Sequence, residues 1–172
     1  MRIGVYAGAF DPITAGHISV IERATRLFDQ LFVLMAVNSS KSTLFKTKDR
    51  LEMIIDAIAT LPNVRVACTE GFVVEFARKH QAKFLIRGLR GASDIEYETA
   101  IANANLTLAP EIATIFIPAQ PELTNVSSSR LKDLAQSGVC ISAYCTQMVS
   151  DRLIERLSQR AGNRREVSNV RI

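Results

Sequence analysis

Five short apolar runs alternate with segments of helical periodicity along most of this chain, and this alternation constrains the fold more than any other feature. The runs occupy residues 2–7, 31–37, 64–68, 83–87 and 113–119. The second run, LFVLMAV, contains no polar residue, which is typical of a strand covered on both faces of a parallel sheet. The pattern predicts an α/β fold with a doubly wound, five-stranded parallel sheet and right-handed crossovers.

A chain of 172 residues is long enough for one domain with a sizeable core. It contains no linker rich in proline, glycine or serine and no internal repeat at a fixed period. We therefore expect a single domain over residues 1–160. Residues 161–172 are basic and lack apolar periodicity, so we expect them to form a flexible C-terminal tail.

The charge distribution disfavours a nucleic-acid partner. The formal net charge is +4, but four arginines and one glutamate in residues 160–172 account for about +3 of it. The rest of the chain is close to neutral and has no tryptophan. No apolar window reaches the roughly 18 residues that a membrane span needs. The three cysteines lack the spacing of a zinc site, so we expect reduced thiols in a cytoplasmic protein that binds neither nucleic acid nor membrane.

The loop after the first strand, GAFDPITAGH, combines two glycines with one of the two histidines of the chain. Gly8 allows close backbone approach, and Gly16 permits an unusual φ. His17 then begins a helix, whose free amide groups and dipole favour an anion. A phosphate bound there would contact the imidazole. The alternative is that His17 only caps the helix, and the loop taken alone favours that alternative.

Cationic side chains follow two further strands. Lys41 lies in the hydroxyl-rich loop after residues 31–37, where a lone lysine is usually solvated surface. Arg87 ends the run 83–87, and Arg90 follows three residues later. A desolvated guanidinium needs an anionic partner, which a bound phosphate would supply. The alternative is pairing within the chain, with Asp94 or Glu98.

Three consecutive serines, residues 127–129, follow the fifth run at a predicted helix start. One serine is sufficient for a cap, so the others predict a second phosphate-binding helix start. Ligands of doubly wound sheets bind at the carboxyl ends of the strands, which is where all of these loops begin. Together they favour a nucleotide and phosphate-transfer site. The chain has neither a Walker loop nor a GxGxxG sequence, which argues against a P-loop kinase and a dinucleotide oxidoreductase.

The TAGH sequence at residues 14–17 resembles the (T/S)xGH signature of the nucleotidylyltransferase superfamily. RGLRGASDIEYE at residues 87–98 and SSSRLK at residues 127–132 resemble segments of the bacterial phosphopantetheine adenylyltransferases. The similarity extends over residues 3–158, with the spacing between motifs kept. It implies a Rossmann-like nucleotidylyltransferase fold.

The resemblance also implies a reaction, in which ATP and 4'-phosphopantetheine give dephospho-coenzyme A and pyrophosphate with the assistance of magnesium. The phosphate of phosphopantetheine attacks the α-phosphorus of ATP in line, and catalysis consists of positioning and charge stabilisation. Members of the family are typically homohexamers and are inhibited by coenzyme A. No cluster of carboxylates is visible, so we assign no metal ligand and expect magnesium to be held by ATP phosphates and water.

Site residues are carried over from the family position by position. The catalytic residues implied are His17, which would stabilise the transition state, together with Lys41 and Arg90. The residues implied to bind phosphopantetheine are Ala9, Lys41, Val73 and Arg87. The residues implied to bind ATP are Ala9, Phe10, His17, Gly88, Leu89, Arg90, Glu98, Leu123, Thr124, Asn125, Val126, Ser127, Ser128 and Ser129.

The sequence departs from the family pattern at two places. Ala9 stands where the family usually carries threonine or serine, whose hydroxyl contacts substrate phosphate. Simple loss of that hydrogen bond would weaken binding by about 1–3 kcal/mol. Residues 120–129 also lack the aromatic side chain frequently found just before the serines, which leaves the adenine contacts there less defined.

Two alternatives stay open. A nicotinamide mononucleotide adenylyltransferase or a glycerol-phosphate cytidylyltransferase would share the histidine signature, but these usually carry an ISST-like motif in place of VSSSRLK. A catalytically inactive relative that senses a nucleotide or coenzyme A is the other alternative. Ala9 supports it, whereas His17, Lys41, Arg87 and Arg90 argue against it.

Overall fold

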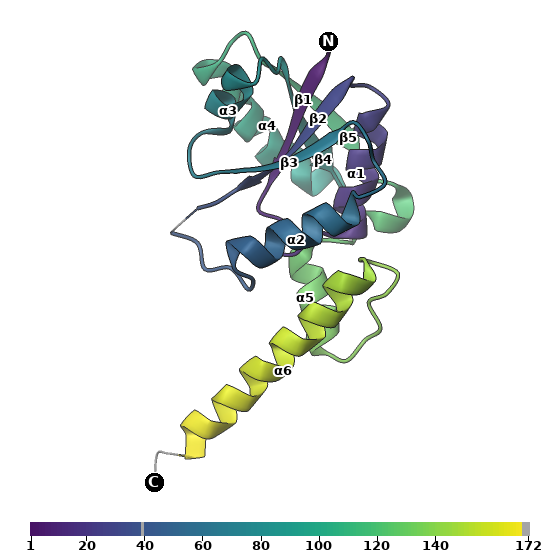
Figure 1. Ribbon diagram of the computed structural model, residues 1–172, viewed down its shortest axis with the longest axis vertical. Coiled ribbons are helices and arrows are strands. Elements are labelled where there is room, and N and C mark those ends of the chain that lie inside the picture. The colour runs from purple at the N-terminus through teal and green to yellow at the C-terminus, as the bar shows by residue number, and fades with distance from the viewer. Residues whose placement is uncertain (39, 170–172) are drawn as a thin grey trace.

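A five-stranded parallel sheet forms the centre of the protein (Figure 1). The computed structural model describes residues 1–38 and 40–169, without the side chains of Ser93 and of residues 161–169. The strands are β1 (Ile3–Gly8), β2 (Gln30–Ala36), β3 (Val64–Thr69), β4 (Phe84–Leu89) and β5 (Ala113–Pro118). Their order is β3-β2-β1-β4-β5, and every neighbouring pair is parallel. The predicted fold class is confirmed.

Helices follow the strands in the predicted alternation. They are α1 (Ala15–Thr25), α2 (Thr47–Ala57), α3 (Val73–Lys79), α4 (Ala92–Leu108), α5 (Ser128–Gln136) and α6 (Gln147–Asn169), with a short 3-10 turn, η1 (Pro121–Leu123), before α5. Helical periodicity predicts the closing helix over residues 142–157. Helix α6 begins later, at Gln147, and continues to Asn169. The helix thus enters the segment for which we predicted a flexible tail, and the flexibility itself stays a prediction.

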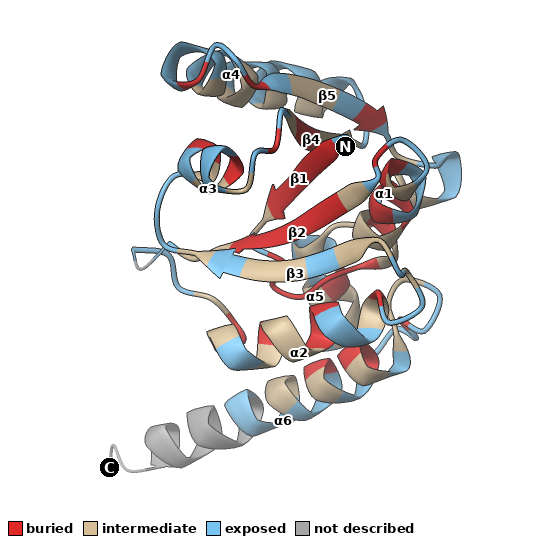
Figure 2. Ribbon diagram, turned by 45° about the horizontal axis from the view of Figure 1, so that its top comes forward, coloured by how far each residue is buried: buried red, intermediate tan, exposed pale blue. Residues whose placement is uncertain are grey.

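Residues 31–36 of strand β2 are all apolar because the strand is covered on both faces. Leu31, Val33 and Met35 pack into one core together with α1, α2, α5 and α6. Phe32 and Leu34, which point the opposite way because side chains alternate along a strand, pack into a second core with α3 and the end of α4. Figure 2 shows β1 and β2 buried between these two layers. Each fully buried side chain of this kind contributes about 1.5–3 kcal/mol.

The order of the strands fixes where a ligand site can form. β1 pairs with β2 on one side and with β4 on the other. From β1 the chain continues outward through β2 and β3, and then returns to the other side of β1 to form β4 and β5. A topological switch point of this kind leaves a crevice outside the carboxyl ends of the strands. The loops that begin at Ala9 and Arg90 start there. Within the described ranges, no helix combines the length and the apolar character needed to cross a membrane.

Candidate active site

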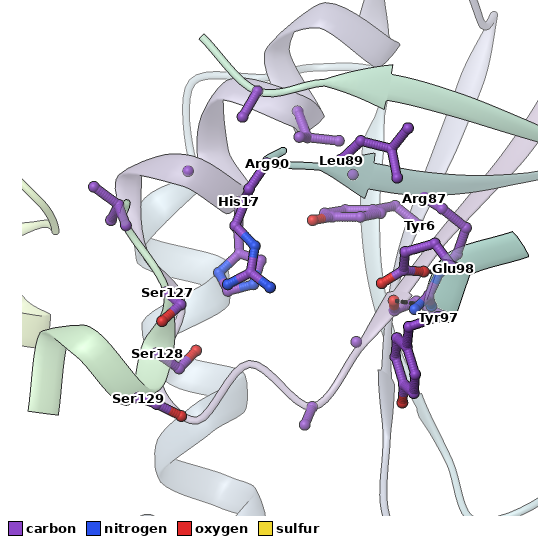
Figure 3. Close-up of a pocket in the computed structure, with 18 residues that line it drawn as sticks. Tyr6, His17, Arg87, Leu89, Arg90, Tyr97, Glu98, Ser127, Ser128 and Ser129 are labelled. Atoms are coloured by element: carbon purple, nitrogen blue, oxygen red, sulfur yellow. Dashed lines mark hydrogen bonds and ion pairs between the residues drawn. The ribbon is translucent and has the colours of Figure 1, made fainter. Parts of the chain in front are cut away.

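A cavity of about 480 Å³ opens at the carboxyl ends of β1 and β4 (Figure 3). Its walls come from the loop after β1, the start of α1, the end of β4, helix α4 and the start of α5. The predicted site residues that line it are Ala9, His17, Arg87, Gly88, Leu89, Arg90, Glu98, Val126, Ser127, Ser128 and Ser129. The fold therefore gathers into one cavity residues that lie far apart in the chain.

His17 both caps helix α1 and lines the cavity. Thr14 is the N-cap residue, and its backbone N–H donates to Nδ1 of His17 at 3.1 Å, which completes a capping box. Because a backbone N–H can only donate, Nδ1 is the unprotonated nitrogen and the ring hydrogen lies on Nε2. The two interpretations of this histidine are therefore compatible, since the cap uses one ring nitrogen and leaves the other for a ligand.

The surroundings of His17 keep its imidazole neutral. Burial, together with the nearby positive charge of Arg90, lowers the pKa of His17 from 6.5 to about 4. The ring of Phe10 supports the imidazole edge-on, with 5.2 Å between ring centroids and an interplanar angle of 76°. At neutral pH, His17 thus offers a neutral Nε2–H donor in a fixed orientation.

The two arginines are paired within the chain and also line the cavity. Nε of Arg87 donates to Glu98 at 2.5 Å, and its Nη1 donates to the carbonyl of Ala7 at 3.4 Å. Arg90 donates to both carboxylate oxygens of Asp94, through Nε at 2.8 Å and Nη2 at 3.1 Å. This hydrogen bonding lowers the pKa of Asp94. The pairing alternative considered for these arginines is therefore real, and each arginine keeps further N–H groups that these contacts do not use.

The three serines at the start of α5 have different local roles. Oγ of Ser127 accepts from the backbone N–H of Arg130 at 3.1 Å and caps the helix. Oγ of Ser128 donates to the carbonyl of Pro12 at 2.8 Å, which ties α5 to the loop after β1. Ser129 lines the cavity. One serine is thus the cap, as expected, and a second one joins two walls of the site.

Three predicted ATP-binding residues lie beside the cavity. Thr124 and Asn125 line an adjoining cavity of about 820 Å³, which shares Arg90 and Ser127 with the first. Leu123 ends the turn η1 immediately before them. The adjoining cavity extends the site along the start of α5, so a ligand longer than a phosphate has room there.

Three further predicted residues do not line the cavity. Phe10 is buried, with 2% of its surface exposed, and contacts the ring of His17 instead. Lys41 is exposed in the loop after β2. Val73 begins helix α3 and packs against the core on the opposite face of the sheet from α1. Their assigned roles stay predictions.

Sequence reasoning missed several residues of the site. Tyr6 and Tyr97 line the cavity, and burial raises the pKa of the Tyr6 hydroxyl. Gly16 does not use the unusual φ that glycine permits, because it lies in the first turn of α1. Its role is steric: a Cβ there would lie 3.0 Å from the carbonyl oxygen of Val126. Small size at this position lets the starts of α1 and α5 approach each other.

The donor set of the cavity does not form a metal site. Across the described part of the chain, no group of three or more His, Cys, Asp or Glu side chains could hold an ion. Glu98, the carboxylate that lines the cavity, is engaged with Arg87, and Asp94 beside it is engaged with Arg90.

The lowered pKa of His17 predicts a loss of stability in mild acid. Below pH 6.5 the unfolded chain binds a proton at this imidazole, whereas the folded chain does so only near pH 4. The stabilising contribution is therefore fully present above pH 6.5 and is lost as pH falls toward 4. We expect a loss of about 1–3 kcal/mol, because His17 is only partly buried. Urea unfolding across this range checks the loss.

The matched control for this experiment is His17→Gln. Glutamine at the third helical position also completes a capping box but does not titrate. The difference in unfolding free energy between the wild type and the variant should therefore change between pH 7 and pH 4 (both values approximate). A difference that stays constant over this range would contradict the lowered pKa.

Sequence comparison identifies the family. The profile of the cytidylyltransferase-like family matches residues 5–134. A phosphopantetheine adenylyltransferase from Caldanaerobacter subterraneus is 40% identical over 159 residues, which cover 92% of this chain and 99% of the relative. The enzyme of the same name from Levilactobacillus brevis is 45% identical over 157 residues, 91% of this chain and 98% of the relative. That from Desulforudis audaxviator is 46% identical over 141 residues, 82% and 86% of the two chains.

Solved structures agree on the fold. A Vibrio parahaemolyticus protein described as a candidate nicotinate-nucleotide adenylyltransferase superposes with a TM-score of 0.68 at 21% identity, over 90% of this chain and 99% of that chain. A Plasmodium falciparum nicotinic acid mononucleotide adenylyltransferase superposes with a TM-score of 0.61 at 16% identity, over 92% and 95%. At this identity the likeness concerns the fold alone. The sequence relatives are more specific, and they show that this chain belongs to the phosphopantetheine adenylyltransferases, a group of enzymes within the cytidylyltransferase-like family.

Proposed function

We propose that this protein transfers the adenylyl group of ATP to 4'-phosphopantetheine and so produces dephospho-coenzyme A and pyrophosphate. The observation that carries the proposal is the convergence of one neutral histidine, two arginines and the N-termini of α1 and α5 on a single cavity. Helix N-termini favour anions, and arginine binds phosphate through its fork of N–H groups. The curated relatives carry this activity in their names.

The reaction needs no covalent enzyme intermediate. A phosphate oxygen of phosphopantetheine forms a bond to the α-phosphorus of ATP, while the bond from that phosphorus to the bridging oxygen breaks and pyrophosphate leaves. Negative charge on the α-phosphate oxygens must be stabilised as this happens. We assign this role to Nε2–H of His17, because the cap at Thr14 already holds Nδ1. Arg90 and Lys41 are proposed to assist it.

Arg87 is prepared for a phosphate before the substrate arrives. Its contacts to Glu98 and to the carbonyl of Ala7 use Nε and Nη1 and fix the plane of the guanidinium. Nη2 makes neither contact, and we assign it to the phosphate of phosphopantetheine. A donor that is already oriented loses little entropy on binding. Lys41 and Val73 are proposed to contact the same substrate.

The remaining predicted residues are proposed to bind ATP. The segment of residues 123–129 and the backbone of residues 88–90 would contact the nucleotide, with the serines near its phosphates. We propose that magnesium arrives with ATP and stays on its phosphate oxygens and on water, since the carboxylates beside the cavity are engaged by arginines. No residue of the chain is assigned to the metal.

Pyrophosphate release tests the proposed reaction. With ATP and magnesium present, we expect release on addition of 4'-phosphopantetheine, because its phosphate is the attacking group. Nicotinamide mononucleotide and glycerol phosphate serve as control acceptors and should give no release above background. Release with either control acceptor alone would indicate a different nucleotidylyltransferase, and binding of ATP without release from any acceptor would indicate the nucleotide sensor.

His17→Gln tests the role of the imidazole without removing the helix cap. The glutamine carbonyl can accept from Thr14 N–H, so we expect the melting temperature to stay close to that of the wild type. We expect kcat to fall by about 10²–10³, because the glutamine amide that caps Thr14 does not hold its N–H at the position of the imidazole Nε2–H, while ATP still binds in calorimetry. His17→Ala, which removes both roles, should lose stability as well. Normal turnover of a folded His17→Gln protein would contradict the assignment.

We further propose a cytoplasmic homohexamer that is inhibited by coenzyme A, as the family resemblance implies. Free thiols at Cys68 and Cys140 are exposed, which suits a reducing compartment. Helix α4 and strand β5 also expose large apolar side chains, which suits burial between subunits. They are Ile95, Tyr97, Leu106, Leu108 and Phe116.

Light scattering after size exclusion checks the assembly. A hexamer has six times the mass of the 19.0 kDa chain. We expect Leu106→Glu, in the last turn of helix α4, to shift the mass toward smaller species because it places a charge in an apolar contact. A wild-type protein that is monomeric at working concentration would contradict the proposal.

A further inference from the structure

The backbone beside the catalytic histidine is strained. Phe10 has a φ of 46°, in the left-handed region that bulky side chains rarely adopt. Such a conformation costs about 1–3 kcal/mol and persists only when surrounding contacts enforce it. Its ring is buried and packs edge-on against His17. The position of the imidazole therefore depends on whatever holds this turn in place.

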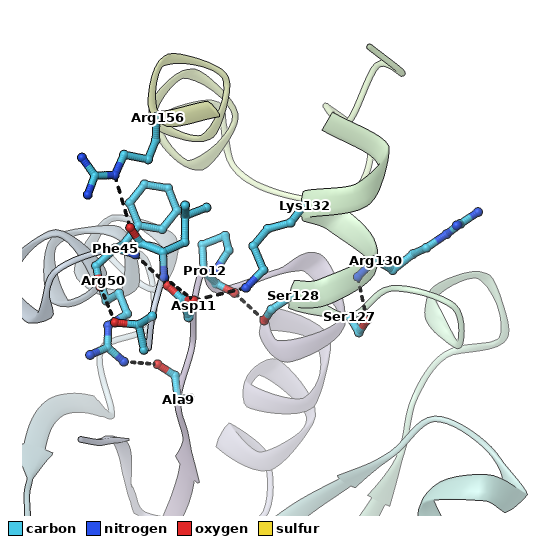
Figure 4. A network of polar contacts seen from close by, with 12 residues as sticks. Ala9, Asp11, Pro12, Phe45, Arg50, Ser127, Ser128, Arg130, Lys132 and Arg156 are labelled. Carbon is cyan, nitrogen blue, oxygen red and sulfur yellow. Dashed lines mark hydrogen bonds and ion pairs between the residues drawn. The ribbon is translucent and has the colours of Figure 1, made fainter. Parts of the chain in front are cut away.

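Two charged side chains hold the turn from either side (Figure 4). On one side the carboxylate of Asp11 accepts from the backbone N–H groups of Leu44 at 2.8 Å and Phe45 at 2.9 Å. On the other side Nη1 of Arg50 donates to the carbonyl oxygen of Ala9 at 2.8 Å. The strained residue lies between these two anchors.

Arg50 is unusual because its charge is buried without an anion. Only 3% of its surface is exposed, and it forms no ion pair with any described carboxylate. Its Nε has no hydrogen-bond partner within the described residues, and its Nη2 makes only a long contact of 3.5 Å to the hydroxyl of Thr47. Burying a cation in this way is costly, so the site gains something that an apolar residue would not supply.

Arg50 fixes the main chain at Ala9, a position whose side chain has no polar group. Ala9 lines the cavity but carries no hydroxyl, so this position can contribute to the site only through its backbone. The carbonyl of Ala9 is turned toward Arg50, and the same peptide unit supplies the N–H of Phe10. An amide whose carbonyl is anchored has its N–H direction set as well, because the peptide bond is planar.

We infer that Arg50 is a positioning residue for adenylyl transfer: by holding the carbonyl of Ala9, it keeps Phe10 in its strained conformation and thereby fixes the ring of His17. The inference rests on the proposed function, and it assigns Arg50 no contact with substrate. A displacement of about 1 Å in a catalytic group can cost on the order of 10² in rate. Arg50 can therefore affect the rate measurably although it does not contact substrate.

Arg50→Met and Arg50→Lys test the inference. Methionine keeps most of the packing volume and removes every donor, and we expect kcat per folded molecule to fall by about 30–100-fold. Lysine keeps the charge and an N–H donor group but not the planar fork, and we expect a fall of about 3–10-fold. The KM for ATP should stay within about threefold in both, because Arg90 and the serines are unchanged.

Arg152→Met is the matched control. Arg152 also contacts helix α2, where Nη1 donates to the carbonyl of Asp49 at 3.3 Å and Nη2 to Glu52 at 2.7 Å, but it does not reach the turn at Phe10. This variant should lose some stability and keep its kcat. A purely structural role for Arg50 predicts the same behaviour for Arg50→Met, with a lower melting temperature and unchanged kcat per folded molecule.

The possible outcomes separate this inference from the proposed function. A wild-type protein without turnover would overturn the proposed function and this inference with it. With an active wild type, three results would overturn the inference alone. The first is normal kcat in both Arg50→Met and Arg50→Lys. The others are an equal loss of kcat in Arg152→Met, and a loss in the Arg50 variants that lies in KM and not in kcat. If Arg50→Met does not fold, the test rests on Arg50→Lys. A fall in kcat of about 3–10-fold in that variant supports the inference, and an unchanged kcat overturns it.

Discussion

The buried carboxylate of Asp11 is the contact on which the geometry of the site depends. Its oxygens accept from the backbone N–H groups of Leu44 and Phe45, and Nζ of Lys132 lies 3.2 Å from Oδ2. One side chain thus joins the loop after β1, the loop after β2 and helix α5. A buried carboxylate is tolerated only when its charge and lone pairs are satisfied, so the three segments are held together or not at all.

The parts of this arrangement that the sequence predicted are those with a local or periodic signal. The apolar runs predicted the parallel sheet, and in such a sheet the loops after β1, β4 and β5 lie at the same edge. His17, Arg87 and the serine triplet were therefore identifiable, since each lies near the carboxyl end of a strand or in the segment that connects it to the next helix. Their convergence on one cavity follows from the topology and needs no knowledge of the contacts between them.

The parts that were missed depend on contacts between distant segments. The Asp11-Pro12 pair indicates only a turn in the sequence. The partners of the Asp11 carboxylate lie 33, 34 and 121 positions away. Arg50 follows Lys48 and Asp49 in helix α2, so the sequence suggests that its side chain is exposed to solvent, whereas the side chain is buried. The small size of Gly16 matters because a carbonyl 110 positions later, that of Val126, lies against it. No pattern within a window of the chain contains this information.

The same contacts explain how His17 is prepared for its proposed role. The cap at Thr14 fixes which nitrogen carries the hydrogen, and Phe10 fixes the plane of the ring. Burial disfavours the charged form, so the donor at neutral pH is an imidazole with a defined tautomer rather than an imidazolium that could rotate between partners. Folding therefore sets the protonation state and direction of this group in advance, and binding of substrate does not have to reorganise it.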